Sequence, residues 1–187
     1  MMLDIPDFVP HSPVAVTTIE AYAGLVPEEM VELWERYGYG SFGEGFVRVI
    51  DPGAYEARIG NLMGKIIGAG PAVPIMVTAL ADVIAWEPDR GVTGLLLRKH
   101  AAVGLGSRPR TLVRLTAQHG ARHLARAFDW APYPEALERL GVPAYDEAFV
   151  PATLRSADRE AGAAALALRP ALPAVEAMLD RQGPILH

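Results

Sequence analysis

The chain has 187 residues, of which 51% are hydrophobic and 21% are charged, and its formal net charge at pH 7 is −5. This balance is typical of one domain with a buried core and excludes a chain that is disordered throughout. The absence of cysteine excludes disulfides, thiolate metal sites and a cysteine nucleophile.

The first residues are rich in proline, and we expect 1–13 to form an extended arm and 14–187 to form a single domain. The start MMLDIPDFVP has acids and prolines where a secretion signal has bases and an apolar run. The longest uncharged stretch, 66–81, is shorter than the roughly 20 residues of a membrane-spanning helix. We therefore expect a cytoplasmic protein with no membrane partner.

The first clear helix is predicted over 27–37. Pro27 suits the first helical turn, acidic residues follow it, and Gly38 provides a stop. Its apolar residues recur at the spacing of one helical face and predict a buried stripe, which comprises Met30, Leu33, Trp34 and Tyr37.

Four glycines among the eight residues of GYGSFGEG (38–45) then predict a loop. A strand is expected over 46–50. A short helix follows from Asp51, a natural N-cap before Pro52, to Ile59.

The middle of the chain predicts a sheet. Short runs rich in Val, Ile and Leu at 73–78, 82–86 and 92–98 are separated by turn residues, which favours an antiparallel meander. Helices are predicted after it at 117–128 with Thr116 as a cap, at 133–140 and at 170–181. Together the elements predict an α+β fold with a central, mostly antiparallel sheet of short strands packed by several helices.

The charges are unevenly distributed along the chain. Residues 1–60 contain ten acidic and three basic residues, a net charge of −7. Between Arg90 and Phe128 there are eight basic residues and no acidic one. Either the two segments lie close together and neutralise each other, or one of them faces a charged partner.

Two short motifs do not support a cofactor. Gly38, Gly40 and Gly43 match G-x-G-x-x-G, but a helix is predicted before them and a strand after them, the reverse of a dinucleotide site. His119 and His123 have metal-ligand spacing, but the arginines beside them disfavour a cation. We expect no cofactor and no metal.

No arrangement of residues indicates an enzyme. The adjacent carboxylates of Asp146 and Glu147 point to opposite faces if they lie in a strand, which disfavours joint acid–base work. No nucleophile–base set is present. Phe128 is the only aromatic residue of the basic segment, and the isoelectric point is near 5.5, so nucleic-acid binding is disfavoured.

A longer pattern resembles a known family. Residues 26–59 combine a P-E-E helix start, a W-x-x-Y-G helix end, a G-S-F-G-x-G loop, a short strand and a D-P-x-x-Y helix. Residues 74–87 (PIMVTALADVIAWE) and 136–152 (ALERLGVPAYDEAFVPA) add two blocks. The set, clearest over 26–152, resembles the GAD-like domain of type VI secretion system immunity proteins.

The chain departs from that family pattern in two places. Leu80 and Ala81 stand where the family usually has a phenylalanine and a glycine. An alanine-rich run, 161–168, replaces the expected glycine pair.

The resemblance implies a protein that binds a co-encoded toxin, typically a nuclease, and neutralises it by stoichiometric, non-catalytic inhibition. We expect the acidic helix and the glycine-rich loop to face the toxin, with Tyr39 and Phe42 as anchors and Glu44 mimicking substrate phosphate. The other residues predicted for this surface are Glu35, Trp86, Asp146 and Glu147.

Two alternatives remain open. Phe42 and Trp34 could instead belong to the core, in which case the family pattern reflects folding. The protein could also be a regulatory module in which Arg98, Lys99 and Arg114 hold a small anionic ligand or nucleic acid.

Overall fold

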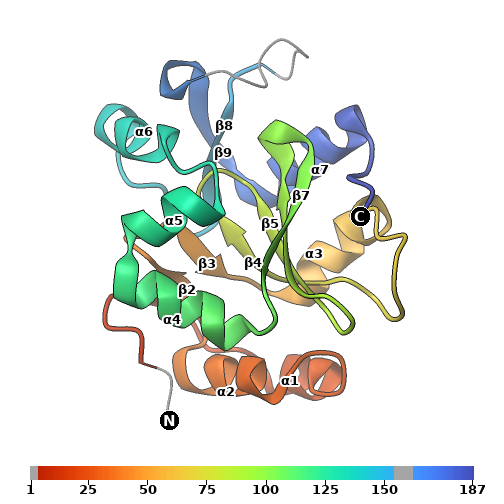
Figure 1. Cartoon of the computed structure of the whole chain (residues 1–187). Helices are drawn as coiled ribbons and strands as arrows, with labels where there is room; N and C mark the ends of the chain where they lie inside the picture. The colour runs from red at the N-terminus through yellow and green to blue at the C-terminus, as the bar shows by residue number, and fades with distance from the viewer. Residues whose placement is uncertain (1–3, 154–161) are drawn as a thin grey trace.

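The computed structural model describes residues 4–153 and 162–187 and is shown in Figure 1. Its centre is a seven-stranded antiparallel sheet in which the strands lie in chain order. These strands are β1 (Val9–Ser12), β2 (Tyr39–Phe42), β3 (Val47–Val49), β4 (Val73–Thr78), β5 (Val83–Glu87), β6 (Gly91–Leu96) and β7 (Ala101–Gly106). A separate hairpin pairs β8 (Glu147–Pro151) with β9 (Leu166–Pro170).

Seven α-helices lie within the described residues and surround this sheet. They are α1 (Val16–Tyr22), α2 (Glu28–Tyr37), α3 (Pro52–Ile59), α4 (Pro109–His119), α5 (Ala121–Ala127), α6 (Pro132–Leu140) and α7 (Ala171–Gln182). Short 3-10 helices are η1 (Gly60–Leu62), η2 (Leu97–Lys99) and η4 (Ala163–Ala165). The predicted α+β fold with a central antiparallel sheet is confirmed.

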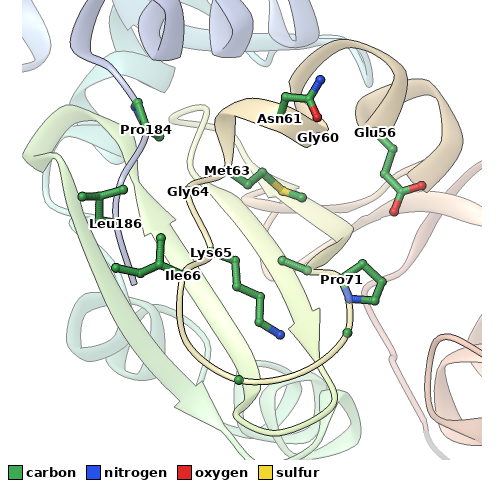
Figure 2. Close-up of a pocket in the computed structure, with 13 residues that line it drawn as sticks. Glu56, Gly60, Asn61, Met63, Gly64, Lys65, Ile66, Pro71, Pro184 and Leu186 are labelled. Atoms are coloured by element: carbon green, nitrogen blue, oxygen red, sulfur yellow. The ribbon is translucent and has the colours of Figure 1, made fainter.

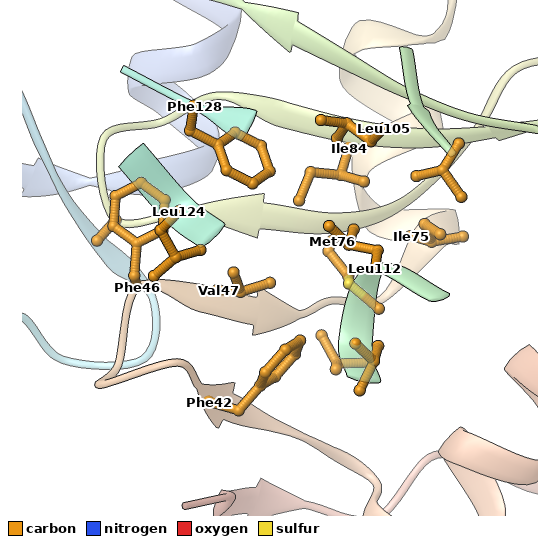
Figure 3. Close-up of a cluster of buried hydrophobic side chains, with 14 of the residues drawn as sticks. Phe42, Phe46, Val47, Ile75, Met76, Ile84, Leu105, Leu112, Leu124 and Phe128 are labelled. Carbon is orange, nitrogen blue, oxygen red and sulfur yellow. The ribbon is translucent and has the colours of Figure 1, made fainter. Parts of the chain in front are cut away.

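Each face of the sheet has its own hydrophobic core. The first core joins the sheet to α2, α4, α5 and α6, and Figure 3 shows Phe42 and Met76 of the sheet gathered with Leu112 of α4 and Leu124 of α5. The second core joins the opposite face to α3 and α7. Because helices cover both faces, every residue of β4 and β6 is buried.

Local signals place several elements where the sequence predicts them. α2 begins after Pro27, ends at Gly38 and leaves Trp34 only 1% exposed. α3 begins after Asp51, whose carboxylate accepts a hydrogen bond from the Gly53 N–H at 2.9 Å. β4 has the predicted bounds.

The predicted loop over 38–45 is wrong in its first half, because Tyr39–Phe42 forms β2 between β1 and β3. A Cβ atom at Gly40 would lie 2.4 Å from the carbonyl oxygen of Val9. The glycine therefore allows the close approach of β1 rather than loop formation.

The helix predicted over 117–128 is correct in its second part, where α5 lies, and wrong in its start. α4 already begins at Pro109, a residue favoured at the first helical position, so Thr116 is buried inside α4 and is not a cap. A break at Gly120 separates α4 from α5.

Strands β7, β8 and β9 are not predicted by the sequence, because alanine and glycine give β7 little strand preference and its pairing with β6 is a tertiary contact. In the alanine-rich run, residue 161 lies outside the described residues, and the rest contributes η4 and the start of β9. Within the predicted N-terminal arm, residues 1–3 lie outside the described residues and 9–12 form β1.

A buried carboxylate holds the turn between β4 and β5. Asp82 is 1% exposed; its Oδ1 accepts a hydrogen bond from the Leu97 N–H at 3.1 Å, and its Oδ2 accepts one from the Thr78 hydroxyl at 3.3 Å. Burial raises the pKa of Asp82 to about 7, although the charge of Arg98 and these hydrogen bonds oppose the shift.

Backbone hydrogen bonds tie the same turn to two other segments. The Ala79 N–H donates to the Phe46 carbonyl at 2.7 Å, and the Ala79 carbonyl accepts from the Phe149 N–H at 2.7 Å. The turn therefore connects the β8–β9 hairpin to the seven-stranded sheet, next to the start of β3.

The C-terminal residues close onto the loop that follows η1. The Ile66 N–H donates to the His187 carbonyl at 2.9 Å, and the His187 N–H donates to the Gly64 carbonyl at 3.3 Å. Gly64 has a φ of +78°, and a Cβ atom there would lie 2.5 Å from the Ile185 carbonyl oxygen.

The raised pKa of Asp82 predicts a pH-dependent stability. The folded state keeps a proton that the unfolded state releases, so the contribution of Asp82 to the free energy of unfolding falls as the pH rises from 3.8 to about 7. Asp82→Asn cannot ionise and should lack this dependence. Urea denaturation at about pH 5 and about pH 8 should show the wild type losing more stability than the variant; equal losses would contradict the assignment.

Gly64→Ala should destabilise the protein more than Gly183→Ala. Gly183 has a φ of +80° with no atom within 4 Å of an added Cβ, so it reports backbone strain alone, about 1–2 kcal/mol. At Gly64 an added Cβ atom would cause the same strain and would also clash with the backbone of Ile185. Urea denaturation measures both variants, and equal losses would show that the close approach at Gly64 costs nothing.

Candidate functional site

The turn between β2 and β3 presents an exposed carboxylate on a fixed backbone. Glu44 lies at the tip with a φ of +58°, an uncommon conformation that costs a residue with a side chain about 1–2 kcal/mol. Its N–H donates to Asp7 Oδ2 at 2.9 Å, and its carbonyl accepts from the Tyr133 hydroxyl at 2.8 Å. The Glu44 turn is thus held from both sides, while the Glu44 side chain remains exposed.

A buried arginine lies in the strand that follows this turn. Arg48 of β3 is 2% exposed and lies between Ser41 of β2 and Val77 of β4 in the sheet register. Neither its Nε nor its Nη1 has a hydrogen-bond partner in the part of the chain that the structure describes. Burial lowers the pKa of the Arg48 guanidinium, because removal from water disfavours the charged form.

Tyrosines from three different segments lie close enough to Arg48 to act on its charge: Tyr55 of α3, Tyr133 of α6, and Tyr145, which precedes β8. Their phenol groups oppose the lowering of the Arg48 pKa. The Tyr145 hydroxyl donates to the Val49 carbonyl at 2.7 Å, and burial raises the pKa of Tyr133 to about 12. We call Arg48 and these three tyrosines the Arg48 cluster.

Four of the residues predicted for the toxin-binding surface lie around the Arg48 cluster. Glu44 contacts it through Tyr133, and the charge of Glu147 raises the pKa of Arg48. Burial raises the pKa of Tyr55, and the charge of Asp146 adds to this shift. Tyr39 is half-buried in β2, and its phenol group adds to the raising of the Tyr145 pKa, which is due first to burial.

The other three predicted residues lie elsewhere. Phe42 is fully buried in the first core, so the prediction that it is an anchor is corrected and the alternative of a core role holds for Phe42, as for Trp34. Trp86 of β5 is partly buried against the first core. Glu35 is exposed on α2 and lines a groove of about 640 Å³ between β1 and the first two helices.

Arg48 itself is not singled out by the sequence. The only local signal is a charged residue in the middle of the apolar run FVRVI (46–50). A lone arginine in a short strand usually lies on a solvated face. Its burial depends on α3, α6 and the segment before β8, which come together only in the folded chain.

The acidic and basic segments neutralise each other in part. Arg108 Nη1 lies 3.2 Å from Glu29 Oε2, and Arg110 Nη2 lies 2.8 Å from Glu32 Oε2. The Arg110 N–H also donates to Glu29 at 3.2 Å. These contacts join α2 to the start of α4.

Two of the three residues predicted to hold an anion are paired within the fold. Asp129 Oδ2 lies 2.7 Å from Arg98 Nη2, and its Oδ1 lies 3.4 Å from Lys99 Nζ. Arg114 is exposed on α4. The described residues contain no group of three or more side chains that could hold a metal, and none of their helices is long and apolar enough to cross a membrane.

A cavity of about 630 Å³ lies beside the loop after η1 and is shown in Figure 2. Lys65 and Glu56 are among its lining residues. Lys65 Nζ lies 3.6 Å from Glu87 Oε2, and His187 Nε2 lies 3.3 Å from Glu87 Oε1. Lys65 is therefore paired with the buried Glu87, and none of the predicted site residues lines this cavity.

Comparison with known proteins identifies the family. The sequence model of the GAD-like domain matches residues 2–98, just over half of the chain. The fold is similar to the crystal structure of Atu4351 from Agrobacterium tumefaciens, with a TM-score of 0.72 and 15% sequence identity, over 92% of this chain and 85% of that chain. No curated protein matches the sequence. Its sequence over 2–98 shows that the chain belongs to the GAD-like domain family.

Proposed function

We propose that this protein is an immunity protein that binds and neutralises a cognate toxin in the cytoplasm. The toxin is of the type VI secreted, nuclease type, and inhibition is stoichiometric and non-catalytic. The proposal draws on the resemblance of residues 26–152 to immunity proteins with a GAD-like domain, and on the surface described above.

The observation that carries the proposal is the conformation of Glu44. A residue with a side chain persists at positive φ only where the surrounding structure holds it, and such strain is concentrated at functional sites. Asp7 and Tyr133 hold the backbone of Glu44 on both sides, and the carboxylate remains exposed. A backbone that is already held loses little conformational freedom when the residue binds, which increases affinity.

Two further acidic residues beside the Arg48 cluster suit a basic partner. Asp146 is exposed, and Glu147 is partly exposed beside the Arg48 cluster. A nuclease must attract the phosphates of its substrate, so its active-site cleft is basic. Carboxylates on a rigid surface can occupy the phosphate positions of such a cleft and block it without catalysis. Tyr39 and Tyr145, both partly exposed, supply aromatic contact area.

Charge changes at Glu44 test the proposal. Glu44→Arg should weaken binding of the toxin encoded by the neighbouring gene by about 100-fold, and Glu44→Gln by about tenfold, because each removes a charge that faces the basic cleft. Calorimetric titration with a catalytically inactive toxin measures the affinity, and rescue of cells that express the active toxin measures protection.

Asp180→Arg is the matched control. Asp180 is exposed near the end of α7, nine residues beyond Ala171, whose N–H donates to the Asp146 carbonyl, so this reversal should leave the affinity unchanged. Melting temperatures of all three variants confirm folding. Wild-type affinity in folded Glu44→Arg would overturn the assignment of this surface, and failure of the wild-type protein to bind the toxin would overturn the proposed function.

A further inference from the structure

The two edges of the seven-stranded sheet differ in their protection. β1, at one edge, has four residues, contains Pro10 and has a register shift between Pro10 and Ser12. Short length, proline and irregular register are the features that prevent an edge strand from pairing with another chain.

β7, at the other edge, is longer and contains no proline, and its one register shift lies at its end, where Gly104 and Gly106 pair with Thr93 and Val92. Its six residues, AAVGLG, include no proline and no charge. Gly104 and Gly106 are exposed, whereas every residue of the neighbouring β6 is buried. The backbone groups on the outer side of β7 have no strand partner within residues 4–153 and 162–187.

The side chains of β7 continue both cores to the edge. Val103 and Leu105 belong to the first core, and Ala102 packs against the second. A strand added beside β7 would extend both apolar layers, with main-chain hydrogen bonds providing affinity and alternate side chains providing specificity.

The charges around β7 favour an acidic occupant. Lys99 precedes the strand and Arg108 follows it, and their side chains are 51% and 71% exposed even though each contacts one acid. Arg90 is exposed in the β5–β6 turn, next to Gly91, where an added Cβ atom would lie 2.5 Å from the Gly106 carbonyl oxygen. An extended segment with acidic residues at its ends would meet these cations.

The same charges disfavour pairing with a second copy of the chain. An antiparallel pair of β7 strands centred between Val103 and Gly104 would place Lys99 of one copy opposite Arg108 of the other. A parallel pair in register would place like residues side by side. Directly opposed like charges destabilise strand pairing.

We propose that β7 receives an extended, acid-flanked segment of the partner protein as an eighth strand of the sheet. This inference rests on the proposed function, since the partner is the cognate toxin, and it adds a second contact to the one at Glu44. The two contacts have opposite charge, so β7 recognises a different part of the toxin from the basic cleft.

Two proline substitutions test the edge. Ala101 and Gly104 are three residues apart in a stretch of regular register, so one amide faces β6 and the other faces the free edge. Ala101→Pro and Gly104→Pro should therefore differ: one lowers the melting temperature, and the other keeps it. The variant that keeps it should bind the inactive toxin at least about tenfold more weakly, because it loses main-chain hydrogen bonds to the added strand.

Hydrogen exchange of the wild-type protein provides a second measurement if both variants unfold. Alternate amides of β7 should exchange more slowly when the inactive toxin is bound. Unchanged exchange, or wild-type affinity in the stable proline variant, overturns the β7 inference while toxin binding itself stands. Failure of the wild type to bind the toxin overturns both proposals. If the free wild-type protein forms dimers and the stable proline variant does not, a second copy of the chain occupies β7 instead.

Discussion

The turn from Thr78 to Asp82 is the point on which the rest of the structure depends. Its carboxylate binds the Leu97 N–H after β6, and the backbone of Ala79 binds both Phe46 before β3 and Phe149 of β8. Three segments that are far apart in sequence therefore meet at one buried turn. A carboxylate at this position has to be fully removed from water, and each of its hydrogen bonds compensates part of that cost.

The elements that the sequence predicts well carry their own start and stop signals. α2 has a proline, acids in the first turn and a terminal glycine, and α3 has an aspartate cap that the structure confirms. β2 and β7 are missed because their glycines and alanines favour loops locally, and only pairing with neighbouring strands makes them part of the sheet. Thr116 resembles a cap, but the stronger start signal at Pro109 places it inside α4.

The sequence predicts the candidate site only in part, because residue types are visible in the sequence but burial is not. Tyr39, Glu44, Asp146 and Glu147 were proposed from their residue types, and the structure brings them around one buried arginine. Phe42 is aromatic like Tyr39, but the two side chains lie on opposite faces of β2. Because side chains alternate between the faces of a strand, Phe42 enters the core and Tyr39 stays half-buried. Part of the charge contrast between the acidic and basic segments is neutralised within the fold, where α2 meets the start of α4.

The matched family segment ends at residue 98, yet Tyr133 and Tyr145, which act on the charge of Arg48, come after it. Arg48 and the Glu44 turn therefore belong to the matched segment together with Asp7 and Tyr55, whereas Tyr133 and Tyr145 lie beyond it. Substitutions in one part of the chain therefore affect the structure of the other. A change of size at Tyr133 would alter both the backbone support of Glu44 and the surroundings of Arg48, so substitutions at these three positions should be correlated among relatives that recognise different partners.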